Sequence, residues 1–154
     1  MKDSSLSIRS SYHEFILSKP NQARRVHSLL ENGRRLLEAG HNNEARRFFL
    51  QALSIYPLVI PALNNLALIA LREGDVNRAI DVIEEVLTCD PRDPIAHGLA
   101  VQCWYFRESE PLVRAHADAC LAGYMQVIEE GDPVDPDYSN RAFPFVFQAL
   151  LIAE

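Results

Sequence analysis

Three side chains that can bind a soft metal lie close together in the sequence. His116 and Cys120 are four residues apart, on one face of a predicted helix, and Cys103 can approach from the helix before it. Imidazole and thiolate groups are ligands of zinc. Cysteine, however, is among the most buried residue types and often packs as a small apolar side chain. We therefore predict core residues here and no metal site.

The carboxylates lack the spacing that calcium binding or shared binding of a substrate would need. The acidic stretch from residue 129 to 137 has neither the glycine nor the ligand spacing of an EF-hand, so we predict a solvated linker. Glu84 and Glu85 are adjacent on a predicted helix and point apart. The chain also lacks GxSxG, HExxH and a glycine-rich phosphate loop. We predict a protein that is not an enzyme and needs no cofactor. The carboxylates of the acidic stretch are Glu129, Glu130, Asp132, Asp135 and Asp137.

Three arginine doublets form the strongest local charge feature. One hypothesis makes them a docking patch for an acidic partner segment, or for the acidic part of a neighbouring copy. The other makes them a solubilising helix surface paired with Glu31, Glu38 and Glu44. We favour the second, because exposed ion pairs are common and contribute little. The doublets are Arg24-Arg25, Arg34-Arg35 and Arg46-Arg47.

Composition indicates one globular domain. The chain has 154 residues, 48% hydrophobic and 23% charged, with a net charge of −6. That charge disfavours non-specific binding of nucleic acid. Its distribution is uneven: residues 1–50 hold nine Lys/Arg against five Asp/Glu, whereas residues 51–154 hold six against sixteen. Such a dipolar molecule can attract charged partners or its own kind, so we keep a homo-oligomer open.

The sequence carries none of the usual signals for export or membrane insertion. Its first residues lack the apolar core of a secretory signal, and no uncharged run is long enough for a membrane helix. Three cysteines without CxxC spacing favour neither a disulfide framework nor a zinc knuckle. We predict a cytoplasmic protein with reduced thiols.

The chain repeats itself with an offset of 34 residues, and the matches lie where two antiparallel helices need them. Gly40 and Gly74 can end a helix in the left-handed conformation, after which Asn43 or Asp75 can cap the next one. Small residues allow close helix packing, and a proline after the second helix stops it. The matched pairs are Leu29/Leu63, Leu37/Leu71, Gly40/Gly74, Asn43/Asn77, Ala45/Ala79, Leu53/Leu87 and Pro57/Pro91.

On these residues the chain resembles the tetratricopeptide repeats. The segment 62–93 fits that consensus almost throughout, and the unit before it fits with Asn32 in place of the usual leucine. A third unit begins at Pro94 but has Glu108 at the turn glycine and no proline at the expected spacing after it. We therefore expect a longer, shifted second helix from about Pro111 to Glu130. The resemblance implies an all-α, right-handed superhelix (solenoid) of antiparallel helix pairs, with about three units and flanking helices.

Domain boundaries follow from this resemblance. The flanking segments should form a short capping helix that ends before Pro20 and an apolar helix after an acidic loop. That last helix either folds back on the third unit or marks a fragment of a longer repeat protein. The predicted segments are 1–25 (N-terminal cap), 26–59, 60–93 and 94–130 (helix pairs), and 131–154 (loop and C-terminal helix).

The resemblance also implies which residues face the concave groove, where the family binds peptides. Tyr, Phe and Arg are common binding hot spots, and Asn can hold a peptide backbone. The alternative is that these positions are solvated or partly core. One subtype of the family clamps a terminal carboxylate; Asn65 matches it, but Leu30, Ile95 and Leu99 replace its basic residues, so we do not expect that clamp. The implied groove residues are His27, Leu30, Arg34, Glu38, Asn64, Leu68, Arg72, Gln102, Tyr105 and Phe106.

The resemblance predicts a non-catalytic protein-interaction module or scaffold that binds a peptide or helical segment of a protein partner. Two alternatives stay open: a regulatory or substrate-docking part of a larger enzyme, and a small secretion-type chaperone. Partner identity and oligomeric state are not encoded in any motif that we find.

Overall fold

Helices make up the whole regular structure of the described residues. The computed structural model describes residues 4–130 and 138–153, and the side chains of residues 11–130 and 141–152. Among them, no helix is long and apolar enough to cross a lipid bilayer. The helices are α1 (Ser4–Ser18), α2 (Pro20–Glu38), α3 (Asn42–Ile55), α4 (Ile60–Arg72), α5 (Val76–Cys89), α6 (Pro94–Phe106), α7 (Glu110–Glu130) and α8 (Tyr138–Ala153).

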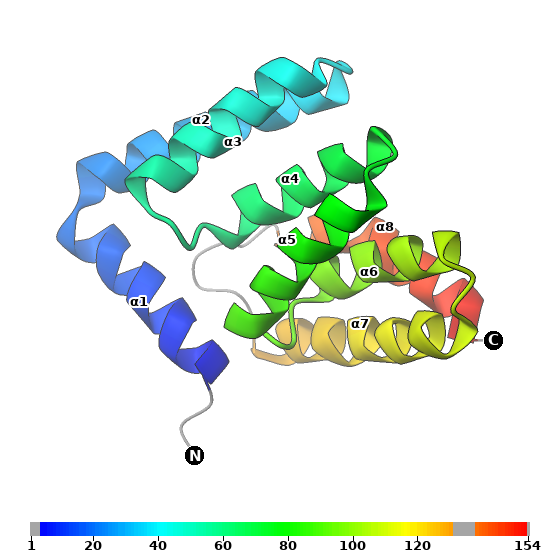
Figure 1. Ribbon diagram of the computed structural model, residues 1–154. Helices are drawn as coiled ribbons and strands as arrows, with labels where there is room; N and C mark the ends of the chain where they lie inside the picture. Colours follow the sequence, from blue (N-terminus) through cyan, green and yellow to red (C-terminus); the bar gives the residue numbers. More distant parts are fainter. Residues whose placement is uncertain (1–3, 131–137, 154) are drawn as a thin grey trace.

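The helices form a solenoid of antiparallel pairs, which confirms the predicted fold class. Figure 1 shows the pairs α2/α3, α4/α5 and α6/α7 stacked in chain order, with α8 against the last pair. Small residues let paired helices approach closely: Ala45 and Ala79 are fully buried, and a Cβ on Gly33 would lie 2.7 Å from the Phe49 ring. Each pair hides its apolar face only by stacking on its neighbours.

Three similar turns join the helices within the pairs. Gly40 and Gly74 adopt positive φ angles of 83° and 79°, and Glu108 adopts 54° at the equivalent place. In each turn the N–H of the next residue bonds to a carbonyl five residues back, as Asp75 does to Ala70 at 2.9 Å. The third unit therefore keeps the left-handed turn although it lacks the glycine. A non-glycine residue is strained there.

Of the two predicted helix caps, one is confirmed and the other is wrong. Asp75 accepts a hydrogen bond from the N–H of Arg78 at 3.1 Å and so caps α5. Asn43 does not cap α3, because it lies inside that helix and accepts instead from Arg46 at 2.9 Å.

Polar contacts mark the two junctions between successive pairs. At the first, Arg46 of α3 donates to Glu73 at the end of α4, at 2.6 Å. At the second, Arg107 at the end of α6 donates to Asn77 of α5. Glu73 and Arg107 occupy equivalent places in the repeat, so the two junctions carry opposite charges there.

Helix α1 packs against the first pair through aromatic rings. It ends at Ser18, before Pro20 as predicted, and Figure 1 shows it turning away from α2. The ring centroid of Tyr56, which follows α3, lies 4.7 Å from that of Phe15 and 5.3 Å from that of Tyr12. These contacts attach α1 to the C-terminal end of α3.

Helices α7 and α8 complete the stack. Helix α7 runs for 21 residues, which confirms the longer second helix of the third unit. Helix α8 packs on that unit: Val146 and Ala149 are buried, and a Cβ on Gly98 of α6 would lie 2.5 Å from that of Phe145. The opposite face of α8 leaves large apolar side chains exposed, namely Phe143, Phe147, Leu150 and Leu151.

Candidate binding groove

The concave side of the solenoid contains a cavity of about 220 Å³. Its walls come from the first helix of each pair, α2, α4 and α6, and from α8. The helical residues that line it recur four positions apart, as in Asn64, Leu68 and Arg72, because that spacing keeps side chains on one helix face. The lining residues are Arg34, Leu37, Glu38, Pro61, Asn64, Asn65, Leu68, Arg72, Ile95, Leu99, Arg141 and Phe145.

A buried amide lies at the bottom of this groove. Asn64 is only 4% exposed, and its Nδ2 donates to Oδ2 of Asp93 at 2.9 Å. The same oxygen accepts from the N–H of Ala96 at 2.8 Å, so Asp93 both caps α6 and links it to α4. The Oδ1 atom of Asn64 has no hydrogen-bond partner within the described residues. An unsatisfied buried acceptor costs roughly 1–3 kcal/mol.

Guanidinium groups form one side of the groove. Arg72 of α4 donates to the carbonyl oxygen of Leu37 at 3.1 Å, which satisfies one of the last carbonyls of α2. Arg34 of α2 is paired with Glu31 on the same helix. Arg141 enters from α8, and Glu38 is the one carboxylate of the lining. The lining thus combines three arginines with one carboxylate, and Glu31 outside the lining already pairs with Arg34.

The structure brings five of the predicted groove residues together. Arg34, Glu38, Asn64, Leu68 and Arg72 all line the cavity, from helices α2 and α4. Their assignment as contacts to a partner stays a prediction.

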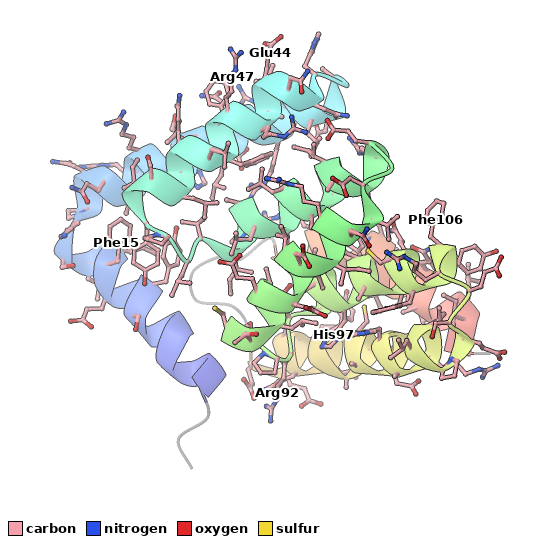
Figure 2. The ribbon with its side chains drawn as sticks, in the orientation of Figure 1. Phe15, Glu44, Arg47, Arg92, His97 and Phe106 are labelled. Atoms are coloured by element: carbon pink, nitrogen blue, oxygen red, sulfur yellow. The ribbon has the colours of Figure 1, made fainter. Side chains whose placement is uncertain are left out.

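The other five predicted residues lie elsewhere. Leu30 is in the core with 5% of its surface exposed, and His27 is exposed outside the cavity lining. Gln102 donates to Gln148 of α8 at 3.1 Å. Tyr105 and Phe106 are 73% and 70% exposed at the far end of α6, where Figure 2 shows Phe106 at the edge of the molecule.

Sequence reasoning missed the lining residues contributed by the third unit and by α8. Ile95 and Leu99 were considered only as replacements in a carboxylate clamp, yet their spacing of four places both on the groove face. Arg141 and Phe145 show the same spacing. This four-residue spacing indicates which residues share a helix face, but it does not indicate that α8 packs against α6.

The former metal candidates are engaged in other contacts. His116 Nδ1 lies 3.0 Å from Nδ1 of His97. Nε2 of His97 lies 2.8 Å from the carbonyl oxygen of Pro91, which can only accept, so in this tautomer Nε2 of His97 donates and its Nδ1 accepts from His116. Figure 2 shows His97 near α7. Burial first, and His97 second, lower the pKa of His116. Within the described ranges no three His, Cys, Asp or Glu side chains gather to hold a metal.

The three cysteines are free thiols. Cys120 is buried and donates to the carbonyl of Pro94 at 3.2 Å; burial raises its pKa to about 12, with a smaller contribution from Asp93. Burial likewise raises the pKa of Cys103 to about 11. Thiols of this kind are unreactive at neutral pH.

The arginine doublets are split between contacts and solvent. Arg34 and Arg46 form ion pairs with Glu31 and Glu73, the second across a junction rather than along one helix. Figure 2 shows Arg47 and Glu44 pointing away from α3. The assignment of the doublets as a solubilising helix surface stays a prediction.

The sequence matches one family profile. Residues 36–103 match the tetratricopeptide repeat family. No curated protein gives a significant sequence match.

Solved structures share the fold at low sequence identity. The type III secretion translocator chaperone SycD of Yersinia enterocolitica aligns with a TM-score of 0.60 and 15% identity, over 84% of this chain and 94% of that one. PcrH of Pseudomonas aeruginosa gives 0.60 and 14%, over 81% and 91%. The TPR domain of P58(IPK) gives 0.57 and 17%, over 96% and 43%.

Proposed function

Because this chain is a tetratricopeptide repeat protein, with the family profile matched over residues 36–103, we propose that it is a protein-interaction module that holds a segment of a partner protein in its groove. The observation that carries the proposal is the cavity itself, where the first helices of the three successive pairs and α8 converge. We assign this role to the three pairs with their flanking helices, and propose that the chain has no catalytic activity of its own.

The size of the cavity favours a peptide over a small molecule. Pockets for small molecules and cofactors usually measure roughly 300–1,000 Å³. This cavity, at about 220 Å³, can take one or two side chains while the rest of a segment runs along the open groove. Its walls combine apolar side chains such as Leu68 and Leu99 with amides and charges, and such mixed surfaces fix the orientation of a bound chain.

The test is selection from a random-peptide library against the immobilised protein, followed by anisotropy titration of the enriched peptides. Leu68→Trp fills the cavity and should lower their affinity at least tenfold. Leu50→Trp makes the same change on α3, outside the cavity lining and at a residue that is 49% exposed, and should leave affinity unchanged. Peptides that bind both variants as tightly as the wild type would place the binding site elsewhere.

A second candidate is a small chaperone, which is the role of SycD, the type III secretion translocator chaperone. The alignments span 94% and 91% of SycD and PcrH, which motivates this candidate. A chaperone should hold its client unfolded. Rapid amide hydrogen exchange throughout the bound client, except at the segment in the groove, would favour the chaperone over a scaffold for folded partners.

A further inference from the structure

The exposed face of α8 is equivalent to a face that the earlier first helices bury. In α4, Ala62 and Ile69 pack in the core that contains α3, whereas the positions that follow them pack in the core that contains α5. In α8, Ala142 and Ala149 have the same spacing and pack toward α7. The positions that follow these two therefore correspond to the α5-facing residues of α4. The equivalent pairs are Phe143/Leu63, Phe147/Ala67 and Leu150/Ala70.

Burial separates the two equivalent faces. Leu63 is 5% exposed and Ala67 is fully buried, because α5 packs on them. Figure 1 shows α8 as the last helix of the stack, and within the described residues no helix follows it to cover the equivalent face. We call this the outer face of α8. Its residues, each between 47% and 61% exposed, are Phe143, Phe147, Leu150 and Leu151.

A second helix of the kind found elsewhere in this chain would not fit the outer face. The residue equivalent to Phe147 in the first pair is Gly33, where even a Cβ would lie 2.7 Å from the Phe49 ring of α3. In the second pair it is Ala67. Phe147 fills the space that such a close second helix needs. The outer face therefore fits a helix that packs farther away and brings large side chains of its own.

Helix α8 of a second copy is such a helix. Large side chains on both helices interdigitate at the upper end of the interaxial distances of ordinary helix pairs, about 8–10 Å. Residues 142–153 carry no charge, so two outer faces meet without removing an ion from water. A face that is complementary to itself gives a closed two-fold dimer.

The apolar area is large enough for a dimer. At roughly 190 Å² for each large side chain, the outer face offers about 400 Å² per copy. On α7, Met125 and Ile128 are each 54% exposed and lie four residues after Leu121 and Tyr124, which pack against α8. They raise the apolar area to about 600 Å². A standard interface buries about 800 Å² per partner, of which about 65% is apolar in homodimers, or about 520 Å².

We propose that two copies of this chain form a two-fold dimer through the outer faces of their α8 helices. The helices run antiparallel, as in every pair of the solenoid, so their dipoles oppose favourably. Two-fold symmetry keeps the sum of two contacting residue numbers constant. Because the outer face runs from Phe143 to Leu151, Phe147 lies on the axis and Phe143 contacts Leu151 of the partner subunit. Arg141 and Phe145 line the cavity from another side of α8, so both grooves of the dimer stay open.

The first experiment is sedimentation velocity of the whole chain across the micromolar range. The expected result is a single species of two chains. Phe147→Glu places two carboxylates at the axis and should raise the dissociation constant at least about 100-fold. Leu50→Glu is the matched control: Leu50 is 49% exposed on α3, and its substitution should leave the dimer unchanged. Circular dichroism checks that both variants keep the fold.

A pair of complementary variants tests the register. Phe143→Glu and Leu151→Lys should each dissociate the dimer, because each sets a charge against an apolar side chain. Mixed one to one, they should restore a dimer, since the introduced carboxylate then faces the introduced ammonium group. Mixing restores nothing if the helices run parallel or if residue 143 faces another position.

The remaining results would overturn the proposal. A wild-type monomer throughout the range, or a dimer that survives Phe147→Glu, would exclude the outer face as the interface. Failure of the mixture to form a dimer would exclude the antiparallel pairing. The α8 dimer should persist in about 0.5 M NaCl, because two copies of net charge −6 repel less there. Dissociation by salt would instead indicate attraction between the unlike ends of two chains.

Discussion

Gly123 provides the sharpest test of the packing. It is buried in α7, and a Cβ at this position would lie 2.1 Å from the carbonyl oxygen of Arg92, in the loop between α5 and α6. Real Cβ atoms essentially never come within 3.0 Å of such an atom, so Gly123→Ala requires the loop or the helix to move by about 0.9 Å. The obstacle is backbone, which cannot rotate away as a side chain can.

The expected size of the effect follows from two opposing contributions. Replacing glycine by alanine inside a helix normally stabilises by about 1 kcal/mol. Overpacking a buried site costs about 1–3 kcal/mol or more, and here the loop is held in place by the buried Asn64–Asp93 bond and by Arg92, which donates to Gln126 of α7 at 3.0 Å. We therefore take the upper end of the overpacking cost, about 3 kcal/mol, and expect a net loss of about 2 kcal/mol.

Chemical and thermal denaturation followed by circular dichroism would measure this. For a chain of this size, a loss of about 2 kcal/mol corresponds to a thermal midpoint lower by roughly 4–8 °C. Ala122→Gly, at an exposed position of the same helix, gives the propensity alone and should cost about 1 kcal/mol. A Gly123→Ala protein as stable as the wild type, or more stable, would refute the close approach of α7 to the loop.

Three further predictions test other parts of the fold. Glu108→Gly should stabilise the protein by about 0.5–1 kcal/mol in urea denaturation, because glycine adopts the φ of 54° without strain. The lowered pKa of His116 means that the unfolded chain binds more protons below about pH 6.5, so stability should fall as pH drops through that range and level off below the folded pKa. His116→Asn should flatten that slope, as measured by urea midpoints from pH 4.5 to 8. In a thiol titration at pH 8, Cys89 should react first, whereas the buried Cys103 and Cys120 should react only on unfolding.

Each of these has an outcome that would count against it. An unchanged or lower urea midpoint for Glu108→Gly would mean that the turn is not strained. Equal pH slopes for wild type and His116→Asn would show that the histidine pair does not resist protonation. Rapid reaction of all three thiols in the native protein would contradict the burial of the last two.

The helical pairs could be predicted from the sequence because their signals are local. A period of 34 residues, glycines such as Gly40 and Gly74 after helical stretches, and prolines after the second helices each act within a few residues of the structure they determine. The longer α7 followed from the missing proline. The prediction that Asn43 caps α3 was wrong, because α3 begins one residue earlier, at Asn42.

The groove could be predicted only in part, because it depends on contacts distant in sequence. Its α2 and α4 walls follow from repeat geometry, which is why Arg34 and Arg72 were found. The prediction for the third unit assumed an exposed α6 face. In the structure α8 covers that face, so Gln102 bonds to Gln148 and the wall is completed by Phe145. No local pattern states where a terminal helix will pack.

The opposite charges at the two junctions have a consequence for the deletion of a repeat unit. Each unit of a solenoid packs only against its neighbours, so deleting one whole unit leaves the remaining units able to stack. Deleting residues 60–93 would bring Arg107 to the place of Glu73, beside Arg46, and set two cations against each other. The units are therefore alike in backbone yet not interchangeable in order.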